Sequence, residues 1–163
     1  MPYLRLHCPA LPVKEKKLIA KELTNATMRY FRLTKSYANR CTVQFVPFEL
    51  EDIAIDGKLL SAGGEPDYHL DVSYRNLSEE QKQTYAREVT PLLARLLNLK
   101  TRSWLARLLR VTDPPLFRVS IHFHEYADNN YAFGGRLLSE MSKTELATPA
   151  ASAENGVQRA VAS

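Results

Sequence analysis

The first two residues, Met1-Pro2, are the part of the sequence that most directly suggests chemistry. Removal of an initiator methionine before a small residue would leave proline at the N-terminus, as a secondary amine fixed rigidly to the backbone. An α-amino group titrates near pH ~8, and burial lowers the pKa of an amine because it disfavours the cation. We therefore predict that Pro2 is a catalytic amine that takes a proton from carbon or returns it.

Histidines are the next residues that could do chemistry. His122 and His124 lie on one face of a predicted strand, and His7 lies on another strand. A metal site needs three or four converging ligands, and the spacing in the sequence shows no such set. We therefore expect no metal and no cofactor. His122 remains a candidate polar group of a substrate pocket, because it shares a strand face with Ser120.

Alternating and helical hydrophobic patterns predict the elements that must position these groups. Strands are expected over residues 2–7, 41–48, from 68 onward and over 117–123. Helices are expected over 13–31 and from the capping box Ser78-Glu79-Glu80-Gln81 onward. Pro91 should kink or interrupt the second helix, because proline lacks an amide hydrogen.

The two halves of the chain repeat one another. The segment 20–24 is similar to 86–90, which lies 66 residues later, and 40–45 is similar to 118–123, which lies 78 residues later. The repeat predicts an α/β (α+β) fold built from a duplicated β-α-β unit, with a four-stranded sheet backed by two main helices. The units are assigned to 2–61 and 68–141, joined by a linker at 62–67.

The larger spacing in the second half places an insertion near 101–113, and the apolar residues around Trp104 predict a short helix there. The Ala- and Ser-rich segment 142–163 is expected to be a disordered tail.

Composition limits the classes of protein that fit. The 163 residues are 45% hydrophobic and carry a net charge of +4, which does not by itself indicate a nucleic-acid partner. No apolar run reaches the ~20 residues that span a membrane, and the N-terminus does not resemble a signal peptide. Two cysteines form no disulfide framework. We expect a cytoplasmic protein with no nucleic-acid or membrane partner, and self-association to cover the open face of the sheet.

The second half, beginning HLDVSYRNLSEEQKQTYAREV, resembles 4-oxalocrotonate tautomerase and its relatives in the tautomerase superfamily. The matching features are the strand, the S-E-E-Q-K helix start and the turn at Gly134-Gly135, while Pro2 matches the N-terminal proline of the family. The layout is similar to the fused, double-unit members. The resemblance implies a tautomerase-like fold, a homotrimer and a cofactor-independent tautomerase or isomerase that acts on a small anionic 2-oxo or 2-hydroxydienoate acid.

The resemblance also implies arginines that hold the substrate carboxylate, and here the sequence departs from the pattern. Four positions at which the family has arginine are Leu11, Leu77, Thr42 and Ser120 in this chain. Arg75, Arg118 and Arg40 lie two residues from three of these positions and are the candidate replacements. Tyr131 matches the aromatic residue that lines the family's pocket.

Two other functions stay open. Members of the superfamily also hydrate or dehalogenate 3-halo-acrylates, with a protonated proline and a carboxylate that activates water. The carboxylates available for that role are Glu49, Glu51, Asp52 and Glu125. Alternatively, the chain is a non-catalytic assembly module that kept the fold after losing the arginines.

Overall fold

The computed structural model describes residues 1–34, 40–99, 114–133 and 135–141. It divides into two compact units, Met1–Tyr126 and the segment from Ala127 onward. The expected insertion at 101–113 and the expected tail at 142–163 lie outside the described residues. Each unit is described by itself.

The first unit is a four-stranded sheet with two helices. Its elements are β1 (Tyr3–Pro9), α1 (Val13–Tyr30), β2 (Thr42–Phe48), β5 (Tyr68–Tyr74), α2 (Glu79–Leu96) and β6 (Val119–Glu125). The strand order is β2-β1-β5-β6, in which β1 and β5 are antiparallel and each pairs in parallel with the strand that follows its helix. The predicted duplicated β-α-β fold is confirmed.

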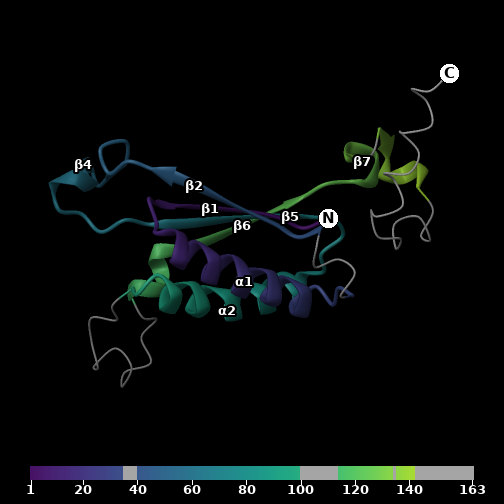
Figure 1. The fold of residues 1–163 in the computed structure, drawn as a ribbon, viewed down its shortest axis with the longest axis horizontal. Coiled ribbons are helices and arrows are strands. Elements are labelled where there is room, and N and C mark those ends of the chain that lie inside the picture. Colours follow the sequence, from purple (N-terminus) through teal and green to yellow (C-terminus); the bar gives the residue numbers. More distant parts are fainter. Residues whose placement is uncertain (35–39, 100–113, 134, 142–163) are drawn as a thin grey trace. The chain divides into compact units, whose positions relative to one another are not determined.

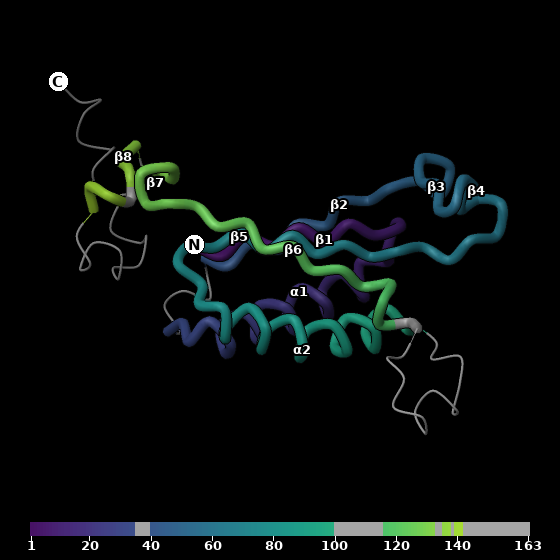
Figure 2. The backbone as a smooth tube through the Cα atoms, turned by 180° about the vertical axis from the view of Figure 1, so that it is seen from behind, coloured from purple at the N-terminus to yellow at the C-terminus, as the bar shows by residue number. Residues whose placement is uncertain are grey.

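Both helices cover the same face of the sheet and lie side by side, as Figures 1 and 2 show from opposite directions. Alternate residues of the two central strands point toward them, because successive side chains of a strand point to opposite faces. The core contains fully buried residues of both strands and both helices: Leu4, Leu6, Leu70, Val72, Ile19, Leu23, Tyr85, Val89 and Leu93. The Tyr85 hydroxyl lies 3.1 Å from the Thr27 hydroxyl in this core, which ties α2 to α1.

The two offsets seen in the sequence recur in the structure. The helices begin 66 residues apart, and Tyr3 pairs with Thr42 as His69 pairs with Ser120. Each half also ends in a two-stranded hairpin: β3 (Ala54–Ile55) with β4 (Lys58–Leu59), and β7 (Ala132–Phe133) with β8 (Arg136–Leu137). Gly57 and Gly135 turn the hairpins at φ +71° and +78°, which favours glycine because it has no Cβ.

The start of α2 agrees with the sequence, but its interior does not. Ser78 and Gln81 form the predicted capping box, in which each side chain accepts a hydrogen bond from the other residue's backbone N–H. The helix then continues through Pro91 to Leu96, so the expected interruption is wrong. Pro91 is exposed, and water can therefore satisfy the carbonyl group four residues earlier that loses its partner.

The other face of the sheet is polar. Its residues, in register across the strands, are Thr42, Gln44 and Val46 of β2, Tyr3, Arg5 and His7 of β1, His69, Asp71 and Ser73 of β5, and Ser120, His122 and His124 of β6. We call this the open face. Within the described part of the chain, no helix is long and apolar enough to cross a membrane.

Candidate functional site

Pro2 lies at one end of the sheet, immediately before β1, and its side chain is fully buried. Its carbonyl oxygen accepts a hydrogen bond of 3.1 Å from the backbone N–H of Thr42, the first residue of β2. Because β1 runs antiparallel to β5 and β6, the last residues of those two strands lie at this same end. We call this end of the sheet the proline end.

Tyr126 lies at the proline end and follows the last residue of β6. Its hydroxyl accepts a 3.0 Å hydrogen bond from the Met1 ammonium and donates one of 3.0 Å to the Met1 carbonyl oxygen. That carbonyl carbon is bonded to the nitrogen of Pro2, so the Tyr126 hydroxyl lies within about 6 Å of that nitrogen. Removal of Met1 would leave the hydroxyl facing the freed amine.

Sequence reasoning missed Tyr126. The repeat had paired it with Phe48, but the two positions lie at opposite ends of the sheet, since Phe48 pairs with Pro9. The signal was the direction of the strands: β6 is parallel to β5, so the residue after Glu125 must lie beside the start of β1.

Two of the three candidate arginines lie at the proline end. Arg40 comes two residues before Thr42, and the Nε atom of its side chain is buried. Arg75 follows Tyr74, the last residue of β5. A planar guanidinium can bind a carboxylate through two hydrogen bonds and stays charged, so these are the arginines that the fold brings nearest to Pro2.

Arg118 lies at the opposite end, since it precedes β6. Its guanidinium donates hydrogen bonds of 2.6 Å and 3.2 Å to the carbonyl oxygen of Pro66 and one of 2.5 Å to the carboxylate of Glu65. Within one chain, therefore, the structure does not bring Arg118 to Pro2.

The four positions that lack the family's arginines have other tasks. Leu77 is buried and Leu11 packs against the core. Thr42 binds the carbonyl group of Pro2 through its backbone, and the Ser120 hydroxyl lies 2.8 Å from Nδ1 of His69. The two leucines thus contribute apolar packing where a charged side chain would need a partner.

Cys41 also lies at the proline end but is a poor nucleophile. Burial raises the pKa of its thiol, against the opposite effects of a hydrogen bond with Thr24 and the positive charge of the N-terminus. The thiol is therefore protonated at neutral pH, and the reactive form of cysteine is the thiolate.

Tyr131 belongs to the second unit, where it precedes β7. Its place in the pocket stays a prediction, because the structure describes that unit by itself.

His122 lies on the open face, where it pairs in register with Asp71 of β5 and not with the residues of the proline end. All four histidines of the chain gather around Asp71 on this face, and we call His7, His69, His122, His124 and Asp71 the histidine cluster. The expectation that no set of metal ligands converges is thus wrong. His69, Asp71 and His122 each offer a ligand atom, and these atoms lie within 4.8 Å of one another.

Asp71 is the centre of this cluster. The side chain is only 14% exposed. Burial alone would raise the pKa of its carboxyl group, but hydrogen bonds from His124, His7 and His69 outweigh burial and lower that pKa to about 2. The carboxylate is therefore ionised at neutral pH and available as a ligand or hydrogen-bond acceptor.

No protein-family model matches the chain, and no curated protein matches it in sequence. Solved structures do match. Native fused 4-OT is 14% identical, with a TM-score of 0.69 over 85% of this chain and 98% of that one. F6 fused 4-OT wild type, an asymmetric trimer, is 14% identical, with a TM-score of 0.66 over 84% of this chain and 96% of that one.

A third match is N1, a member of the cis-3-chloroacrylic acid dehalogenase (cis-CaaD) family. It is 17% identical, with a TM-score of 0.67 over 96% of this chain and 99% of that one. At these identities the matches establish the fold: the chain has the tautomerase-superfamily fold in its fused form.

Proposed function

We propose that the chain is a cofactor-independent tautomerase or isomerase in which Pro2, freed by removal of Met1, moves a proton on a small 2-oxo or 2-hydroxydienoate acid. One observation carries the proposal. A buried proline at the start of a central strand shares its end of the sheet with Tyr126, Arg40 and Arg75. An amine, a hydroxyl and two guanidinium groups are the groups that proton transfer next to a carbonyl requires.

The roles follow from the chemistry of each group. An amine in this buried position favours the neutral form, so its nitrogen accepts the proton from one carbon and returns it to another. Tyr126 donates a hydrogen bond to the oxygen on which negative charge develops. Arg75 or Arg40 binds the substrate carboxylate. His122, Arg118 and Tyr131 reach this pocket only if another chain or the second unit supplies them.

The test compares the wild type with Pro2→Ala in the ketonisation of phenylenolpyruvate and 2-hydroxymuconate. We expect kcat/KM to fall about 100-fold or more, because a positioned acid or base contributes on that scale. Tyr126→Phe should lower kcat about 100-fold with little change in KM. Pro9→Ala, at the far end of β1, is the matched control and should keep full activity.

Mass spectrometry of the mature N-terminus is the second measurement. The proposal requires that Met1 is absent, because an amide nitrogen cannot act as a base. Retained Met1, or equal rates for wild type and Pro2→Ala, would contradict the proposal and favour a non-catalytic assembly module.

A second candidate is the hydration or dehalogenation of 3-halo-acrylates. It is supported by the match to a cis-CaaD family member, which covers more of this chain than the fused 4-OT structures do. Of the four carboxylates that the sequence offered, only Glu125 lies at the proline end, where it forms an ion pair with Lys82. Chloride release from 3-chloroacrylate that depends on both Pro2 and Glu125 would favour this reaction over tautomerisation.

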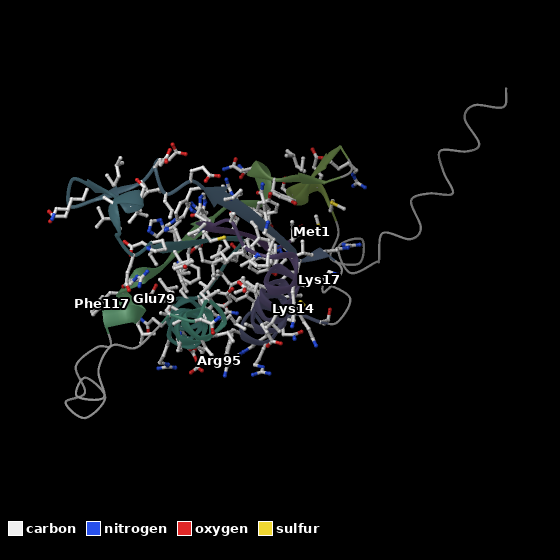
Figure 3. All side chains as sticks on the ribbon, turned by 60° about the vertical axis from the view of Figure 1, so that its left-hand side comes forward. Met1, Lys14, Lys17, Glu79, Arg95 and Phe117 are labelled. Atoms are coloured by element: carbon white, nitrogen blue, oxygen red, sulfur yellow. The ribbon has the colours of Figure 1, made fainter. Side chains whose placement is uncertain are left out.

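We also propose a homotrimer. The fused 4-OT match is a trimer. The edge strands β2 and β6 leave unpaired backbone groups. Apolar side chains are also exposed: Phe117 is 72% exposed and projects from the surface in Figure 3, and Ile55 and Leu59 of the β3–β4 hairpin are 40% and 47% exposed. The polar open face itself does not require an apolar cover, so the exposed edges and hairpin carry this proposal.

A further inference from the structure

The histidine cluster on the open face is the largest group of metal-ligating side chains in the described part of the chain outside the proline end. It includes every histidine of the sequence. Three strands contribute: His7 comes from β1, His69 and Asp71 from β5, and His122 and His124 from β6. A random distribution of four histidines over the surface would not centre them on one carboxylate.

The distances suit a bound ion. Three imidazole Nε2 atoms lie 2.9 Å, 2.9 Å and 3.1 Å from the carboxylate oxygens of Asp71, in His69, His124 and His7 respectively. Ligand atoms that bind one metal ion at ~2.0–2.2 Å lie about 3 Å apart, so these pairs already have the spacing of neighbouring ligands. The set within 4.8 Å adds His122, whose ring packs edge-on against that of His69 with centroids 4.0 Å apart.

The surroundings of the cluster also suit a metal. Nδ1 of His69 lies 2.8 Å from the hydroxyl of Ser120, and such a partner fixes the orientation of a metal-binding imidazole. Asp71 is only 14% exposed, whereas the side chain of His124 is 54% exposed. An ion held at Asp71 would therefore be anchored from below and reachable from solvent.

From this geometry we propose that the histidine cluster is a binding site for a divalent first-row transition metal ion such as Zn²⁺. Asp71, His69 and His122 provide the ligands, and His124 or His7 completes the shell. Two or more imidazole nitrogens and one carboxylate are a donor set that suits zinc, nickel and iron(II) better than calcium or magnesium, which prefer oxygen ligands. The proposal is independent of the proline end.

The test is a titration of untagged, chelator-treated full-length protein with Zn²⁺ by calorimetry and with Co²⁺ by visible absorption. We expect saturable binding of one ion per chain, and a Co²⁺ spectrum with the intensity of a site that is not octahedral. Mg²⁺ should not compete. Wild-type protein that shows no saturable binding of either ion would overturn the proposal and leave the cluster as a hydrogen-bonded network only.

Variants locate the site. His122→Gln should weaken Zn²⁺ binding about 100-fold, and Ser120→Ala about tenfold through loss of the partner of His69. His122 is exposed, so its replacement should not unfold the protein. Asp71→Asn should abolish binding, and its circular dichroism spectrum shows whether the variant is folded. Asp52→Asn makes the same charge change at an exposed position far from the cluster. Equal affinity in His122→Gln and Asp52→Asn would overturn the proposal.

Discussion

At the scale of single residues, strand direction decides which candidate groups can meet Pro2. Arg40 and Arg75 both adjoin strand ends that lie beside the start of β1. Arg118 resembles Arg40 in its position within the repeat, yet it lies at the other end of the sheet and binds Glu65 and Pro66. Equivalent positions in a duplicated unit therefore differ in what they can do, because only the first unit begins with a free amine.

This difference predicts distinct kinetic effects for two arginines. Arg75→Ala should raise KM for 2-hydroxymuconate about 10- to 100-fold, because one charge-assisted hydrogen bond to the carboxylate is lost. Arg118→Ala is the matched control: it removes the same charge from the other end of the sheet. Steady-state kinetics measures both. If KM rose only in Arg118→Ala, carboxylate binding would have to involve Arg118 of a neighbouring chain.

At the scale of elements, the contact between α1 and α2 depends on a buried tyrosine. Tyr85 is fully buried and its hydroxyl pairs with that of Thr27, which is also fully buried. Burial raises the pKa of the Tyr85 hydroxyl far above its ordinary value, against the opposite effect of the hydrogen bond with Thr27. The helix pair thus contains an ionisable group that stays neutral as long as the protein is folded.

The raised pKa predicts a loss of stability in alkali. In the unfolded chain a tyrosine ionises near pH ~10, while folded Tyr85 does not. Its contribution is therefore complete below that pH and decreases as the pH rises further, by up to ~1.4 kcal/mol per pH unit. Tyr85→Phe should be less stable at pH 7 by about 1–2 kcal/mol, because Thr27 loses its partner. It should also lose less stability between pH 10 and 11, which are about the values where the free side chain ionises.

Urea unfolding at several pH values measures both effects. Tyr3→Phe is the control, since Tyr3 is 38% exposed and its replacement should leave the alkaline slope unchanged. Identical alkaline slopes for wild type and Tyr85→Phe would contradict this account of the helix pair.

At the scale of the whole molecule, two features point outward from the single chain. A two-stranded hairpin such as β3–β4 is marginally stable alone, and both edges of the four-stranded sheet are open. Contacts with neighbouring chains would satisfy both. The open face, by contrast, is polar and carries its own network around Asp71.

The proposed assembly predicts a mass in solution of three times 18.5 kDa by sedimentation equilibrium. Replacing both Ile55 and Leu59 with arginine should shift the mass toward that of the single chain, because charged side chains would be buried in the contact. Val13→Arg is the control, since Val13 is exposed on α1 and not on the hairpin. A single-chain mass for the wild type would exclude the trimer.

The sequence by itself determined the elements and their repetition. Alternation and helical spacing are local properties, so the strands around Leu4 and Leu70, the helix start at Ser78 and the offset between the two halves could be found without coordinates. The same local chemistry identified Pro2, because an N-terminal proline at the start of a strand needs no tertiary contact to be recognised.

Only the tertiary structure decided which distant side chains meet. His7, His69 and His122 are separated by more than fifty residues at each step, and the hydrogen-bond register of three strands places them around Asp71. Register and strand direction likewise brought Tyr126 to Pro2 and took Arg118 away from it. Residues far apart along a chain become neighbours through strand pairing, which depends on the whole sheet and which no local pattern of residues specifies.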